Sequence, residues 1–159
     1  MSNLPKVVKK NLQDILKDEG LLKEDVLGEV LGRHKSSGVP LHRVLHEMGL
    51  LAEMDLLRAI SKQLNLPYID ASVYRVSKDV IGLFPVTLMM EHQFTVLDKI
   101  GRAIVVATAG PPPHDVVEKI EKGSGSHAFF YLSTVSQIEA AISKHHMSGT
   151  AESAAAKQG

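Results

Sequence analysis

The sequence contains no cysteine and no tryptophan. Without cysteine there can be no disulfide bond, thiolate zinc site, iron–sulfur cluster or cysteine nucleophile. Aromatic residues make up only 4% of the chain, and the three tyrosines and four phenylalanines all lie at or after Tyr68. The segment before Tyr68 must therefore be packed by aliphatic side chains alone, which is the first indication that the chain has two parts.

Net charge and long apolar runs are also missing. The 18 lysines and arginines balance 18 aspartates and glutamates, whereas nucleic-acid-binding proteins normally carry a clear basic excess. No stretch approaches the roughly 18 apolar residues of a membrane-spanning helix, and no apolar segment follows the N-terminal lysines as it would in a signal peptide. We therefore expect a cytoplasmic protein with no nucleic-acid partner and no direct membrane insertion.

The most informative feature present is an internal repeat of 24 residues. Residues 11–34 (NLQDILKDEGLLKEDVLGEVLGRH) match residues 40–63 (PLHRVLHEMGLLAEMDLLRAISKQ) at a constant offset of 29, across the spacer KSSGV. Apolar residues three and four apart predict a helix, a tight turn and a second helix in each unit. Gly20 and Gly49 stand where a helix-ending glycine is favoured, and the Leu-Leu pair after each glycine is expected to be a buried anchor.

From Pro67 onward the pattern changes to short strands and helices. The predicted strands are 68–69, 94–97, 103–107 and 127–132. Helices are predicted over 78–91, divided by Pro85, around 116–120, and over a last segment capped by Ser133 or Thr134.

These elements predict an α+β fold. A four-helix tandem helix-hairpin repeat would occupy residues 1–66, and residues 67–146 would form a small α/β sandwich-like subdomain with a mainly antiparallel sheet. Residues 147–159 are small and polar, which predicts a disordered tail or a linker.

The repeat, its spacer and the LPYID segment that follows resemble the N-terminal domain of the assembly ATPases of type II secretion and type IV pilus systems (the GspE/PilB/MshE type). The resemblance covers roughly residues 8–146. It implies a domain that docks the ATPase onto the cytoplasmic part of an inner-membrane platform protein, so that the chain would be peripheral to the membrane through that partner. In the MshE branch, the tandem motif binds cyclic di-GMP.

The resemblance also implies a candidate ligand site, because the family motif opens with Arg-Leu-Gly, has Gly-Leu/Ile-Leu/Ile in the middle and closes with Gln. The corresponding residues here are Asn11, Leu12, Gln13, Leu21, Leu22, His34, Leu41, His42, Leu50, Leu51 and Gln63, with Pro40 at the second opening position. The apolar positions are retained, but both opening arginines and both opening glycines are replaced.

The sequence gives weaker indications of a metal site or a catalytic site. His42 and His46 have the i, i+4 spacing of paired metal ligands, but HRVLH is not H-E-x-x-H, and two surface histidines explain the spacing. No G-x-x-x-x-G-K-[ST] or G-x-S-x-G motif occurs. The sequence therefore predicts a non-enzymatic docking domain with no cofactor, and a cyclic di-GMP receptor with a degenerate motif is the alternative. It leaves open whether the chain is a stand-alone protein or a fragment.

Overall fold

The computed structural model describes residues 12–39 and 41–145, so Asn11, Pro40 and the predicted tail lie outside the described residues. The described chain begins with α1 (Leu12–Asp18), α2 (Glu24–Ser37), α3 (Leu41–Met48) and α4 (Glu53–Leu64). These helices form the two predicted helix–turn–helix units, and residues 12–64 are called the helical part below.

Each unit turns at its glycine, as the sequence predicts. Gly20 and Gly49 have φ angles of 60° and 62°, in the left-handed region that glycine adopts without a steric penalty. The amide of Gly20 donates to the Lys17 carbonyl and that of Gly49 to the His46 carbonyl. Asn65, which has a φ of 55°, ends α4 in the same conformation.

The helical part is packed by aliphatic side chains. Ile15, Leu16, Val30, Val44, Leu45 and Ile60 are each 1% exposed or less, and burial of such side chains contributes about 1.5–3 kcal/mol each. Leu21, Leu22 and Leu51 pack partly buried against this core. Leu50 is 37% exposed, so the expectation of a buried anchor is wrong for Leu50.

The remaining described residues, 65–145, are called the α+β part. Its strands are β1 (Phe94–Ile100), β2 (Ala103–Thr108) and β3 (His127–Leu132). β1 and β2 pair antiparallel, whereas β2 and β3 pair parallel, because α7 (His114–Ser124) connects them as a crossover. The sheet is therefore mixed, and the antiparallel expectation holds only for β1 and β2. The predicted strand at 68–69 is reduced to a single bridge from Tyr68 to Leu132.

Short helices complete this part: η1 (Ala71–Val73), α5 (Lys78–Ile81), α6 (Val86–His92) and a last helix over residues 135–145. Pro85 separates α5 from α6, as predicted. Thr134 caps the last helix, since its Oγ1 accepts from the Gln137 amide (3.1 Å) while Gln137 Oε1 accepts from the Thr134 amide (3.0 Å). This reciprocal pair is a capping box.

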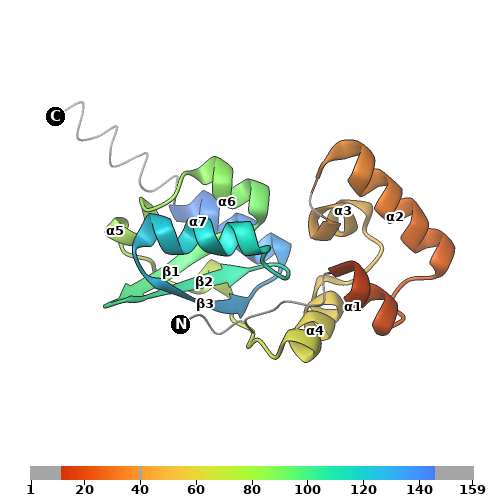
Figure 1. Cartoon of the computed structure of the whole chain (residues 1–159), viewed down its shortest axis with the longest axis horizontal. Coiled ribbons are helices and arrows are strands. Elements are labelled where there is room, and N and C mark those ends of the chain that lie inside the picture. Colours follow the sequence, from red (N-terminus) through yellow and green to blue (C-terminus); the bar gives the residue numbers. More distant parts are fainter. Residues whose placement is uncertain (1–11, 40, 146–159) are drawn as a thin grey trace.

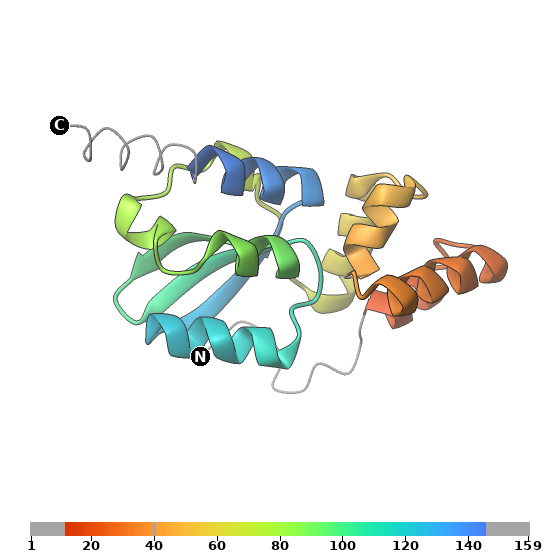
Figure 2. The ribbon, with the colours of Figure 1, turned by 90° about the horizontal axis from the view of Figure 1, so that it is seen from above.

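Figures 1 and 2 show the α+β part as a layered unit, with α7 on one side of the sheet and the helix over residues 135–145 on the other. The helical part stands beside it, and α2 is its outermost helix. Buried residues of both parts nevertheless belong to one hydrophobic cluster.

The second repeat unit makes polar contacts with the α+β part. Arg43 donates to the Met90 carbonyl (3.5 Å) and lies 3.8 Å from Glu139 Oε1. Glu53 Oε1 accepts from the backbone amide (3.0 Å) and the hydroxyl (2.8 Å) of Ser136. Ser136 is in the first turn of the last helix, where the helix dipole favours a negative charge. His46 Nδ1 lies 2.9 Å from the same Glu53 oxygen.

Candidate functional site

A pocket of about 380 Å³ lies between the helical part and the loop that follows β2. Its volume is within the range of roughly 300–1,000 Å³ that is usual for small-molecule sites. The lining residues come from both parts: Leu12, Gln13, Leu31, His34, Gly38, Leu41, His42, His92, Thr108, Gly110, Pro111 and Pro113.

The opening residues of both repeat units meet in this pocket. Leu12 and Leu41 are equivalent by the repeat, as are Gln13 and His42, and all four line it. Each pair stands in the first turn of its helix, because α1 begins at Leu12 and α3 at Leu41. With His34, five of the predicted site residues share one pocket, and their role in ligand binding stays a prediction.

His42 occupies space that a glycine would leave open. A methyl group built on Gly110 would lie only 3.3 Å from His42 Nδ1, and His42 Nε2 is buried without a hydrogen-bond partner. Burial lowers the pKa of His42 to about 4, and the neighbouring charge of Arg43 and the nearby His34 and His92 act in the same direction. The ring is therefore neutral at pH 7.

His42 is thus not a surface histidine, contrary to the sequence-based expectation, whereas His46 is exposed as expected. The spacing of the two histidines on α3 does not reveal this, because the burial of His42 comes from the loop at Gly110.

The closing residues of the two units have different surroundings. His34 donates from Nδ1 to the Val39 carbonyl and lines the pocket. Its equivalent, Gln63, donates to Glu19 Oε1 (2.6 Å) in the first unit, and Gln63 is not among the lining residues. This hydrogen bond lowers the pKa of Glu19 most strongly, and Lys62 adds to the effect, while partial desolvation opposes it.

Among the described residues, the other predicted site residues do not line this pocket, and Asn11 lies outside the described part of the chain. Leu21 and Leu22 pack against the core, and Leu50 is exposed. Leu51 lines a much smaller cavity of about 20 Å³ together with His42, between the two parts.

The sequence prediction missed the wall that the α+β part contributes. Thr108 Oγ1 donates to the Gly110 carbonyl (2.9 Å) and so fixes the start of the loop, and Pro111 and Pro113 add stiff apolar surface. Figure 2 shows this loop on the side of the α+β part that faces the helices. The Gly-Pro-Pro-Pro run was a visible signal but indicated only a stiff loop, and nothing in the sequence singled out His92.

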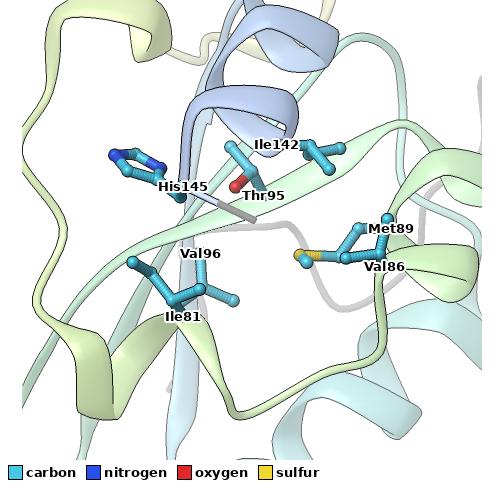
Figure 3. A pocket seen from close by; sticks show the side chains of 7 residues that line it. All are labelled: Ile81, Val86, Met89, Thr95, Val96, Ile142 and His145. Atoms are coloured by element: carbon cyan, nitrogen blue, oxygen red, sulfur yellow. The ribbon is translucent and has the colours of Figure 1, made fainter. Parts of the chain in front are cut away.

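A second pocket, inside the α+β part, is shown in Figure 3. Ile81, Val86, Met89, Thr95, Val96, Ile142 and His145 line it. Its volume of about 10 Å³ holds no more than about one water molecule. Burial lowers the pKa of His145, helped by Lys144 and opposed by a hydrogen bond with the Tyr74 backbone. This pocket is too small for an organic ligand.

Across residues 12–39 and 41–145, no three histidine or acidic side chains gather in the way that a metal ion requires. In the same residues, no helix combines the length and apolar character needed to span a bilayer.

Comparison with known proteins identifies the family. The family model described as the MshEN domain matches residues 64–152, more than half of the chain. This chain belongs to the MshEN domain family. The matched segment begins at the end of α4, so the tandem repeat that carried the sequence resemblance lies outside it.

Two type IV pilus assembly ATPases named PilB are similar in sequence to this MshEN domain. The protein from Thermus thermophilus is 29% identical over 139 residues, and the protein from Myxococcus xanthus is 22% identical over 135 residues. The alignments cover 86% and 85% of this chain but only 16% and 24% of the two PilB proteins. The chain therefore corresponds to a small portion of each relative.

Solved structures match the fold of both parts. The structure of MshE with cyclic di-GMP is 27% identical, has a TM-score of 0.62, and is matched over 86% of this chain and 99% of that chain. One structure of the N-terminal domain of XpsE has a TM-score of 0.67 at 16% identity, covering 87% of this chain and 95% of that one. Because the MshE match covers 86% of the chain, it includes residues of the tandem repeat.

Proposed function

We propose that this MshEN domain is a non-enzymatic docking domain with a regulatory role in a type IV pilus or type II secretion machine. The correspondence with a solved N-terminal domain supports the proposal, because the XpsE domain is matched over nearly its whole length. The matched regions belong to ATPases but lie outside their motor. The partner we propose is the cytoplasmic part of an inner-membrane platform protein, which would hold the domain at the cytoplasmic face of the membrane.

Direct binding tests this proposal. The purified chain is immobilised, and the purified cytoplasmic segment of the platform protein encoded in the same genome is passed over it, with a heat-denatured chain as the control surface. Saturable binding to the folded chain alone is expected, together with no ATP hydrolysis above a buffer blank. Absence of binding, or measurable ATP turnover, would contradict the proposal.

A second candidate function is that of a cyclic dinucleotide receptor, and the pocket is the observation that favours it. The opening residues of both units line one pocket of suitable size, and the MshE domain that shares the fold was solved with cyclic di-GMP. The opening arginines of the family motif are Asn11 and Pro40 here. Losing two charge-assisted hydrogen bonds at roughly 1.5–3 kcal/mol each would weaken binding by about two to four decades.

The receptor candidate is tested by calorimetric titration of cyclic di-GMP into three proteins. They are the chain itself, a variant with Pro40→Arg and His42→Gly, and a matched control with Pro40→Ala and His42→Gly. We expect weak binding by the chain and a gain of at least about tenfold that requires the arginine. No binding by the chain at near-millimolar ligand, with no gain from the arginine, would remove this candidate.

A further inference from the structure

Gln93 is unusual among the buried polar residues. It ends α6 in the left-handed conformation, with a φ of 54°, which costs free energy for a residue other than glycine. Its side chain is fully buried, yet its Oε1 has no hydrogen-bond partner in the part of the chain that the structure describes. A strained backbone and an unpaired buried oxygen both lower stability, so stability alone does not account for this glutamine.

The other polar atoms of Gln93 join three separate segments. Nε2 donates to the Met90 carbonyl near the end of α6 (2.8 Å) and to Glu139 Oε1 of the last helix (3.4 Å). The reversed amide would set its oxygen against both acceptors, so these acceptors fix which way the amide points. The Gln93 carbonyl accepts from the amide of Ala109 (3.1 Å), which begins the loop after β2. Gln93 therefore ties α6, the last helix and this loop together.

Arg43 of the helical part reaches the same two acceptors. Its Nη1 donates to the Met90 carbonyl (3.5 Å), and its Nη2 lies 3.8 Å from Glu139 Oε1. Figure 2 shows α6 and the last helix with their ends next to the helical part. Arg43, Met90, Gln93 and Glu139 are called the Gln93 cluster below. Within it, Gln93 holds a carbonyl and a carboxylate at the place where one guanidinium meets both.

A second polar contact joins the two parts at Glu53 and Ser136. Ser136 and Glu139 are three residues apart on the last helix and so lie on one face of it, whereas Met90 belongs to α6. A single contact leaves a pivot, and apolar surfaces do not fix an angle, because the hydrophobic effect has no direction. Hydrogen bonds are directional, so a second contact that includes another helix fixes the angle between the parts.

We infer that Gln93 is a positioning residue that sets the orientation of the helical part on the α+β part, and that it contributes this orientation rather than stability. A buried polar group can specify one arrangement without making it more stable. The inference goes beyond the proposed docking role and holds whichever partner or ligand the domain binds. Because the 380 Å³ pocket has walls from both parts, its width depends on this orientation.

The test measures the orientation by pulsed EPR between spin labels at Lys35→Cys on α2 and Lys122→Cys on α7. Both positions are exposed, and the chain has no cysteine of its own. Gln93→Met keeps the length of the side chain and removes both of its polar atoms. We expect Gln93→Met to broaden or shift the distance distribution, while the midpoint of urea unfolding stays the same or rises. Gln63→Met, the same change within the helical part, should leave the distribution unchanged.

A distribution in Gln93→Met identical to that of the parent would overturn the inference. A broadened distribution with a clearly lower unfolding midpoint would also overturn it, because Gln93 would then be an ordinary stabilising residue. Arg43→Met added to Gln93→Met should broaden the distribution no further, since the two residues act on the same acceptors. Further broadening would mean that Arg43 acts without Gln93, contrary to the inference.

A second variant decides the question if Gln93→Met does not unfold cooperatively. Glu139→Gln keeps the size of the side chain on the last helix and removes the charge that Arg43 meets. A broadened distribution in Glu139→Gln would support the inference, and an unchanged distribution would overturn it.

Discussion

The two repeat units share an apolar pattern but have different surroundings. The second unit contacts the α+β part through Arg43 and Glu53, whereas the first unit contributes Leu31 and His34 of α2 to the pocket. Even equivalent leucine and isoleucine positions diverge, since Ile60 is fully buried while Leu31 lines the pocket. Both copies of the duplicated helix hairpin thus line the pocket, and the second copy also contacts the α+β part through Arg43 and Glu53.

The comparison also shows where the two copies still act together. Leu12 with Leu41, and Gln13 with His42, bring equivalent positions into one pocket. The retained apolar positions keep the scaffold, and the exchanged polar positions change what the pocket offers a ligand. Each of the following predictions tests one difference between the units.

The largest expected effect is a difference in stability loss between Ile60, which is buried, and its equivalent Leu31, which lines the pocket. Ile60→Ala should lower the free energy of unfolding by about 3–4 kcal/mol, because it opens a cavity in the core. Leu31→Ala should cost only about 1 kcal/mol, because its side chain already borders open space. Urea unfolding of both variants measures the difference, and equal losses would show that the two units are packed alike.

The second prediction concerns His42, whose counterpart Gln13 does not titrate. Its pKa in the folded chain is lowered from 6.5 to about 4, so the unfolded chain binds the proton more readily. The free energy of unfolding is therefore unaffected by His42 above about pH 6.5. It falls by up to about 3 kcal/mol as the pH falls from there toward 4, because the unfolded state takes up the proton first. His42→Gln should flatten urea-measured stability over that range. His114→Gln at an exposed position should not, and an unchanged slope in His42→Gln would refute the burial of a neutral ring.

The third prediction compares the equivalent residues Glu24 and Glu53. Glu53→Ala removes the acceptor for two Ser136 donors and should cost about 1–2 kcal/mol, as the loss of a helix cap does. Glu24 is exposed, so Glu24→Ala should stay within about 0.5 kcal/mol of the parent. Thermal unfolding measures both, and a matching loss in Glu24→Ala would mean that the first unit is anchored as firmly as the second.

The smallest expected effect concerns the closing residues. The Gln63 amide lowers the pKa of Glu19, so the stability that this carboxylate adds is present above its usual pKa and fades as the pH falls through the lowered value. Gln63→Ala should raise the Glu19 pKa, measured by carbon-detected NMR titration of the carboxyl. His34→Ala should leave that titration unchanged, and a shift of similar size would indicate that the two closing residues are interchangeable.

The sequence predicted the helical units, the glycine turns, the division at Pro85 and most of the strands, because these depend on local periodicity and on backbone conformation. It did not predict that β3 runs parallel to β2, since strand periodicity is the same in either direction. The burial of His42 depends on Gly110, and the diversion of Gln63 depends on Glu19. Such contacts between distant segments do not appear in the sequence periodicity. Five of the twelve pocket-lining residues could therefore be named from the sequence, whereas the wall after β2 could not.

The central claim is that the opening residues of both units form one ligand pocket with the loop after β2. A titration of the labelled chain with cyclic di-GMP tests it most directly. The account predicts concerted shifts of the Leu12, Gln13, Leu41, His42 and Gly110 amides on a single binding curve. Shifts confined to one unit, shifts centred on Leu50 instead, or no shifts at near-millimolar ligand would contradict it.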